Sequence, residues 1–129
     1  MASVASAVRT AITGASISGI DNNVFRDLAP DSQALPYVTF MSDISREPAF
    51  QGDGNVLART QVVQVDLWQA LSSEDVATVE SLLAALDSAT LTGADKHIFK
   101  CRVLDVARLT EPEQDICHHA LMLDVTHSN

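Results

Sequence analysis

The side chains of this chain that are best able to catalyse a reaction or bind a metal belong to its two cysteines and four histidines. Cys117, His118 and His119 are consecutive, and Cys101 precedes them in a separate apolar segment. A thiol beside an imidazole can act as a nucleophile, and cysteine together with histidine can bind zinc. Either chemistry requires that the local structure bring these side chains together.

The two adjacent histidines do not make a zinc pair if they lie on a strand. Successive side chains of a strand point to opposite faces, so His118 and His119 cannot close on one metal ion. His97, His127 and the cysteines would have to complete a site, and the sequence has neither CxxC nor HExxH spacing. We therefore expect ordinary histidines, no metal and no cofactor.

A Cys–His enzyme needs a thiol whose pKa is lowered by a nearby imidazole. Cys101 and Cys117 both lie in expected strands with apolar residues at alternate positions, which is typical of buried, inert cysteines. A hairpin is expected to turn at Pro112 and Glu113. Cys101 then lies opposite Asp124, about seven residues or ~23 Å from Cys117 at ~3.3 Å per residue. We expect free thiols and no enzymatic activity, with a small Cys/His hydrolase or transferase as the alternative.

The run from Arg46 to Asn55 (REPAFQGDGN) is a candidate contact loop. It lacks the GxxxxGK[ST] spacing of a phosphate loop and leads into a strand, while its proline and glycines predict a mobile, projecting loop. Phe50 lies among charged residues, where it either tucks under its own loop or anchors in a partner. The candidate interface residues of this loop are Arg46, Glu47, Phe50 and Asp53.

The segment from Val56 to Ala70 is the longest strand signal and offers a second candidate surface. The odd-numbered residues from Val63 to Leu67 are apolar and suit the core, whereas the alternate face mixes polar residues with Val62 and Trp68. Trp68 either contacts a partner or packs beneath a loop. The candidate interface residues of this strand are Arg59, Gln64, Asp66 and Trp68.

The elements that must position these residues follow from hydrophobic periodicity. Three-to-four spacing predicts a helix over Ser3–Thr13 and a second helix that starts at Ser72 or Ser73 and ends near Ser88. Alternation and β-branched residues predict the other elements. The expected strands are Pro36–Ser45, Val56–Ala70, His97–Leu109 and Asp115–Thr126, with one short extended piece at Val24–Arg26 in the connection from Ile20 to Pro36.

Within these segments, particular residues are expected to face the core. Val38, Phe40 and Ile44 point inward from the first long strand, and Leu121, Leu123 and Val125 share one face of the last. On the strand before it, the inward residues are expected to be Phe99, Cys101, Val103, Ala107 and Leu109. The apolar stripe of the second helix is expected at Val76, Val79, Leu82, Leu83 and Leu86.

This order of elements predicts an α+β fold. A sheet of about four strands, mostly antiparallel, with two helices packed on one face accommodates all of the elements. A length of 129 residues is typical of one domain, so we expect a single domain over residues 1–129.

The charge balance restricts the classes of partner. With 17 acidic and 8 basic side chains the formal net charge is −9, which disfavours gripping DNA, because such binding needs lysine and arginine to neutralise phosphates. No apolar run reaches the roughly 20 residues of a membrane helix, and the N-terminus lacks a signal-peptide pattern. We expect a soluble cytoplasmic protein that works through protein contacts.

Several segments, placed in this order, resemble the tail terminator or tail completion proteins of long-tailed (siphovirus-like) bacteriophages. The resemblance rests on the N-terminal helix, on VFRDLAP (Val24 to Pro30), on LPYVTF (Leu35 to Phe40) and on VQVDLWQ (Val63 to Gln69), which leads directly into an amphipathic helix. It covers most of the chain, although residues 117–119 match no pattern of the family.

The resemblance implies a non-enzymatic virion structural protein that forms a ring, typically a homohexamer, at the head-proximal end of the tail. The ring would halt tube growth and offer a surface for head joining. Its partners would be other copies of itself, the tail tube protein and the head connector or a head-closure protein. DNA would pass through without specific binding, and assembly would take place in the host cytoplasm without a membrane. The alternative is another head–tail adaptor or head-closure protein of the phage neck.

Overall fold

The structure, a computed structural model, describes residues 4–50, 56–87, 91 and 98–128. Over these ranges one sheet holds β1 (Val24–Arg26), β2 (Tyr37–Phe50), β3 (Val56–Ala70), β4 (Ile98–Glu111) and β5 (Ile116–Ser128), in the order β1-β2-β3-β5-β4. The helical elements are α1 (Val4–Gly14), α2 (Val76–Leu86) and the 3-10 turns η1 (Leu71–Ser73) and η2 (Pro112–Gln114). Neither α-helix in these ranges has the length and apolar character that crossing a bilayer requires.

The predicted α+β class is confirmed, but the sheet has five strands and is mixed. The short piece Val24–Arg26 is a strand of the sheet, where it pairs in parallel with β2 through Val24 and Val38. The backbone amide of Val38 donates to the carbonyl of Asn23 at 2.9 Å, and that of Asp27 donates to Phe40 at 2.8 Å. Burial of Val24 holds this edge strand against the core.

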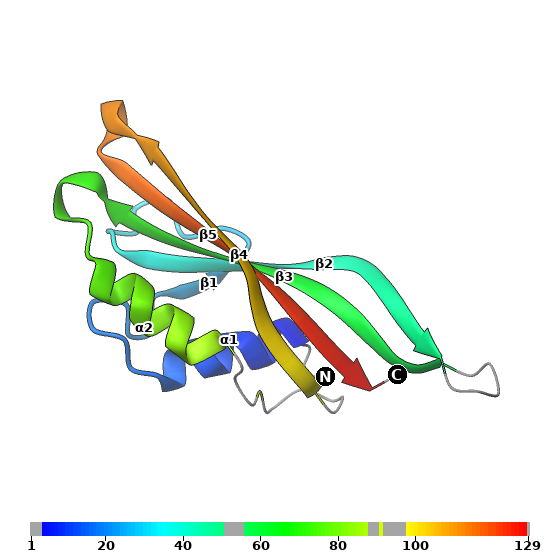
Figure 1. Cartoon of the computed structure of the whole chain (residues 1–129). Coiled ribbons are helices and arrows are strands. Elements are labelled where there is room, and N and C mark those ends of the chain that lie inside the picture. The colour runs from blue at the N-terminus through cyan, green and yellow to red at the C-terminus, as the bar shows by residue number, and fades with distance from the viewer. Residues whose placement is uncertain (1–3, 51–55, 88–90, 92–97, 129) are drawn as a thin grey trace.

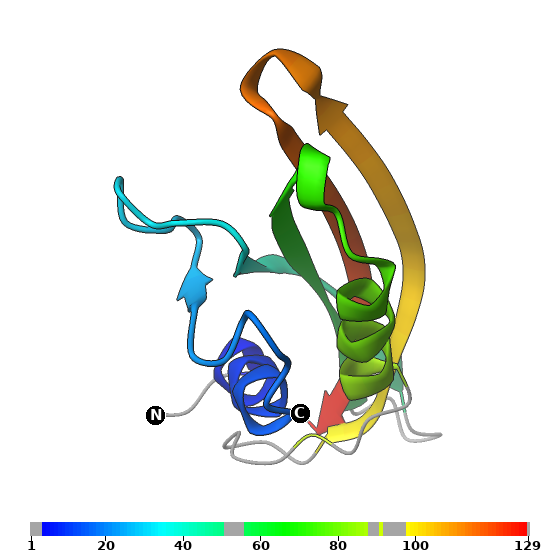
Figure 2. The ribbon, with the colours of Figure 1, turned by 90° about the vertical axis from the view of Figure 1, so that its left-hand side faces the viewer.

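Both helices pack on the same face of the sheet, as predicted (Figures 1 and 2). Each helix buries the apolar stripe that the periodicity places on one side, and the strands supply their alternate apolar residues beneath. The core therefore lies between one layer of helices and one layer of strands. Its most completely buried members include Val8, Ile12, Val63, Leu67, Leu82, Leu86, Leu121 and Leu123.

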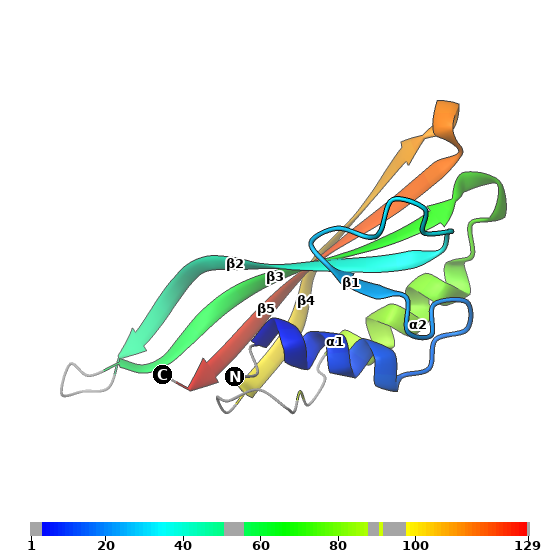
Figure 3. The same cartoon turned by 180° about the vertical axis from the view of Figure 1, so that it is seen from behind.

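The hairpin of β2 and β3 is longer than the sequence predicts. The expected loop at Arg46 is wrong, because β2 continues to Phe50 and Arg46 pairs with Gln61. Pro48 is tolerated because β1 pairs with β2 only as far as Phe40, so that β2 is an edge strand at Pro48 over the described residues. The hairpin projects well past the helices (Figures 1 and 3). Residues 51–55 lie outside the described ranges.

The helix α2 begins later than the predicted start at Ser72 or Ser73. Those serines form η1, and Asp75 is the N-cap, since its Oδ1 accepts a 2.9 Å hydrogen bond from the backbone amide of Ala77. Leu82 and Leu86 are fully buried as expected. The inward placement of Val76 is wrong, because its side chain is 63% exposed at the start of the helix.

A β-bulge in β4 overturns part of the predicted inward face. Val103 pairs with Leu123, whereas Asp105 pairs with Met122, so one extra residue lies between them. Beyond the bulge, the β4 residues that strict alternation would place inward point outward, and the others point inward. Ala107 and Leu109 therefore lie on the face away from the helices, and Leu109 is 54% exposed.

The C-terminal hairpin turns through η2, close to the predicted Pro112. Cys101 pairs with Val125 and not with the expected Asp124. The turn is centred one residue later than predicted, which moves the partner of Cys101 further along β5. The bulge in β4 moves that partner part of the way back. Cys101 and Cys117 are both buried and both free, as predicted.

The bulge can be tested by comparing two leucines of the same hairpin. Leu121→Ala should lower the free energy of unfolding by about 2–5 kcal/mol, because it opens a cavity in the core. Leu109→Ala should change it by no more than about 0.5 kcal/mol, because this side chain is largely in solvent. Urea unfolding of both variants provides the measurement. Equal losses would show that Leu109 faces the core and that β4 has no bulge.

Candidate functional site

The sheet face opposite the helices is the first candidate site, and we call it the outer face. Alternation on β5 buries the odd-numbered residues and leaves the even-numbered ones half-buried. Trp68 of β3 pairs with His118 of β5, and Gln64 with Met122, so the even-numbered residues of both strands form this face. Over the described residues, no helix covers it (Figure 2).

A row of aromatic rings crosses four strands of the outer face. Phe25 meets Tyr37 edge to face with ring centroids 6.3 Å apart, and Tyr37 stacks on Trp68 at 6.2 Å. Trp68 in turn stacks on His118 with centroids 4.0 Å apart and planes inclined by 10°. Leu109 pairs with His118 and continues the row onto β4. The row forms an apolar band from β1 to β4.

Polar contacts hold these rings in place. The Trp68 Nε1–H donates to Thr39 Oγ1 at 3.0 Å. His118 Nε2 lies 2.6 Å from Asp66 Oδ1, and Gln64 Nε2 donates to both Asp66 oxygens at 3.0 and 3.1 Å. Asp66 is only 3% exposed, whereas its partners Gln64 and His118 are half-buried. The network fixes the orientation of Trp68 and His118.

The structure brings together three of the predicted interface residues, namely Gln64, Asp66 and Trp68. Trp68 is half-buried by neighbouring rings on this face and is not in the core. Arg59 is odd-numbered, whereas the residues of the outer face on β3 are even-numbered, so Arg59 belongs to the helix side of the sheet. The other four predicted residues lie on the β2–β3 hairpin, where Arg46, Glu47 and Phe50 are placed on the β2 backbone and Asp53 is outside the described ranges.

Sequence reasoning missed four members of the row. These residues lie on other strands than Trp68, and only the strand pairing brings them together, namely Phe25, Tyr37, His118 and Leu109. The alternation of β5 separates His118 from His119, as predicted. A prediction of which β3 residue pairs with which β5 residue would have revealed the contact between Trp68 and His118.

A second group of polar side chains lies on the helix side of β5, at the end near η2. Cys117 and His119 are two residues apart and therefore share a face. Asp115 holds η1 above them, because its Oδ1 accepts from the Ser72 amide at 2.8 Å and its Oδ2 accepts from the Ser72 hydroxyl at 2.7 Å. This tie places Glu74, which follows η1, over the strand.

Glu74 is the centre of this group. The Arg108 guanidinium donates to both Glu74 oxygens, at 2.9 Å from Nε and 2.6 Å from Nη2. His119 Nε2 lies 3.3 Å from Glu74 Oε2, and its Nδ1 lies 3.9 Å from Cys117 Sγ. A carboxylate, an imidazole, a thiol and a guanidinium therefore meet at one place.

The electrostatics of this group disfavour a thiolate nucleophile. Hydrogen bonds from Arg108 lower the pKa of Glu74 to about 2, so their stabilising effect is complete above the ordinary carboxyl pKa and is lost as the pH falls towards 2. Burial raises the pKa of Cys117 and lowers that of His119. At neutral pH the resting state is thus a neutral thiol beside a neutral imidazole.

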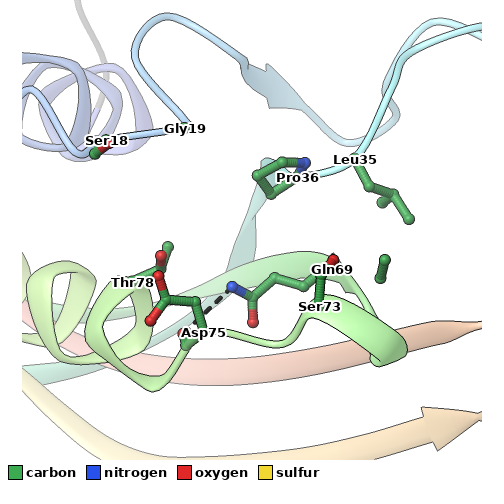
Figure 4. Close-up of a pocket in the computed structure, with 9 residues that line it drawn as sticks. Ser18, Gly19, Leu35, Pro36, Gln69, Ser73, Asp75 and Thr78 are labelled. Carbon is green, nitrogen blue, oxygen red and sulfur yellow. Dashed lines mark hydrogen bonds between the residues drawn. The ribbon is translucent and has the colours of Figure 1, made fainter.

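A pocket of about 260 Å³ lies where the loops before β1 and β2 approach the start of α2 (Figure 4). Gln69 lies beside Asp75, and its Nε2 donates to the Asp75 carbonyl at 3.3 Å. The Asp75 carboxylate already caps α2. The described lining, namely Ser18, Gly19, Leu35, Pro36, Gln69, Ala70, Ser73, Asp75 and Thr78, does not pair a nucleophile with a base.

Comparison with known proteins places this fold among phage tail components. A family model described as Tail completion protein gp17 matches residues 1–128. A chain in the virion of a native gene transfer agent particle is similar in structure, with a TM-score of 0.69, 15% identity, and coverage of 98% of this chain and 96% of that chain. At that identity the likeness shows a shared fold. No curated protein sequence matches this chain.

Thiol labelling tests whether the polar group can act as an enzyme. Burial raises the pKa of Cys117, and it raises that of Cys101 to about 11, so both thiols should react slowly with Ellman's reagent at neutral pH. Both should react at once after unfolding in urea. The single variants C101S and C117S assign each rate. Rapid labelling of Cys117 in the folded protein would support the alternative of a Cys/His enzyme.

Proposed function

Because this chain belongs to the tail completion protein gp17 family, we propose that it forms a ring on the tail tube of a bacteriophage virion. The ring, a homohexamer by resemblance, stops tube polymerisation and provides the surface to which the head joins. Such a role depends on complementary protein surfaces and not on a reaction. It also fits the resting state of the polar group around Cys117, which lacks a thiolate.

The observation that carries this proposal is the apolar band on the outer face. A sheet face in contact with water usually presents polar residues, yet this face presents a row of stacked rings. Two exposed apolar side chains extend it, since Met41 is 39% exposed and Leu109 is 54% exposed. Aromatic residues and methionine are enriched in protein interfaces. The outer face therefore suits a contact with the next copy in the ring.

The β4 edge is less suited to such a contact. The backbone amide of Val103 donates to Asp87 Oδ1 at 3.0 Å, and that of Val106 donates to Asp105 Oδ1 at 2.9 Å. These carboxylates and the bulge occupy groups that an added strand would need. Subunits should accordingly meet through the outer face and not by extending the sheet at this part of β4.

The projecting β2–β3 hairpin offers a separate contact. It extends beyond the layer of helices, so it can reach a neighbouring protein while the core stays intact (Figure 3). We assign it to the tail tube. The net charge of −9 is consistent with a ring through which DNA passes without adhering, because like charges repel.

Charge insertion on the outer face tests the proposed ring. Leu109→Lys and Met41→Lys should abolish rings and the capping of tail tubes, because each puts a charge into an apolar contact. Val76→Lys is the control, since Val76 is an exposed apolar residue that lies on α2, and it should assemble as the wild type does. Light scattering with and without tail tube protein, together with electron microscopy of tube ends, provides the readout.

Two results would contradict the proposal. One is a wild-type protein that stays monomeric and never binds tube ends at any concentration or salt. The other is normal capping by both lysine variants of the outer face. Binding to head connectors without binding to tubes would instead identify a head-closure protein of the neck.

A further inference from the structure

The group around Glu74 contains three different metal-ligating side chains. Glu74, Cys117 and His119 each offer a ligand atom, and these atoms lie within 4.8 Å of one another. Cys117 and His119 are buried and Glu74 is nearly so, with 19% of its side chain exposed. Two of the ligands come from β5 and the third follows η1, so a shared ion would join two segments that are distant in sequence.

The three side chains lie close enough together to reach a tetrahedral site after small movements. Zinc bonds of about 2.0–2.3 Å put neighbouring ligand atoms roughly 3.2–3.8 Å apart. The two short distances run to different nitrogens of the His119 ring, since Nε2 lies 3.3 Å from Glu74 Oε2 and Nδ1 lies 3.9 Å from Cys117 Sγ. One ring nitrogen must therefore turn towards both partners before it can share an ion with them. A rotation of the His119 ring and a small movement of Glu74 would direct one atom of each residue at a common centre.

We propose that Glu74, Cys117 and His119 form a binding site for Zn²⁺ or a similar divalent transition metal. Sulfur and imidazole ligands select such ions, whereas Mg²⁺ and Ca²⁺ prefer oxygen ligands. Three protein ligands leave a fourth position for water. The site lies on the helix side of the sheet, so this inference goes beyond the proposed ring and does not depend on it.

Arg108 competes with the metal for Glu74. Its guanidinium occupies both carboxylate oxygens, and its positive charge opposes the arrival of a cation. The Arg108 side chain is 50% exposed, so it can move into solvent when a cation replaces its charge beside Glu74. Arg108 therefore controls access to the site, and its removal should strengthen metal binding.

The sequence signal for this site is Cys-x-His on a strand, because residues two apart share a face. The adjacent pair His118 and His119 conceals it, since only His119 points towards Cys117. The first of this pair contacts Asp66 on the outer face. The chain thus provides matched controls, with a second histidine and a second buried cysteine, Cys101, outside the site.

Cobalt titration of the untagged, reduced, full-length protein tests the site. The wild type should develop a near-ultraviolet thiolate charge-transfer band with strong visible bands of tetrahedral Co²⁺, and Zn²⁺ should abolish them. Cys117→Ser should lose the thiolate band and His119→Ala should bind at least tenfold more weakly. Cys101→Ser and His118→Gln should bind cobalt with the same spectrum and affinity as the wild type. Arg108→Gln should bind severalfold more tightly.

A thermal readout keeps the test decisive if a variant is unstable. Zn²⁺ should raise the Tm of the wild type and of Cys101→Ser, because it binds only the folded site, but not that of Cys117→Ser. The proposal is overturned if no thiolate band appears with excess cobalt. It is equally overturned if the band persists in Cys117→Ser or if Arg108→Gln weakens binding.

Discussion

The packing of both helices on one face of the sheet is the constraint on which the rest of the structure depends. It commits the odd-numbered residues of β3 and β5 to the core, where Leu67, Leu121 and Leu123 are fully buried. The even-numbered residues must then form a face that no described helix covers. The proposed assembly surface therefore uses no residue that the core needs.

The alternation of β5 also separates two kinds of chemistry. His118 and His119 are neighbours in sequence, yet one stacks on Trp68 at the outer face and the other approaches Glu74 behind the sheet. The first is held by Asp66 and so stiffens an apolar band. The second lies with Cys117 in a nearly closed group. One strand thus carries the proposed assembly surface on one side and the proposed metal site on the other.

Periodicity predicted the elements well because it reflects burial directly. The helix near Val4–Gly14, the strand Val56–Ala70 and the inward face of β5 follow from it. The bulge after Val103 could not be predicted, because one inserted residue leaves the local composition unchanged. The group around Glu74 could not be predicted either, because it forms only when Asp115 holds η1 above β5. The contacts of the aromatic row likewise depend on register, which a single sequence does not specify.

Oxidative footprinting of the free protein and of assembled tails tests the assembly surface most directly. Side chains on the outer face, Met41 and Trp68 above all, should be labelled in the free protein and protected in tails, while Val76 on α2 stays labelled in both. Equal labelling of Met41 and Trp68 in the two states, with protection moved to α2, would contradict the account.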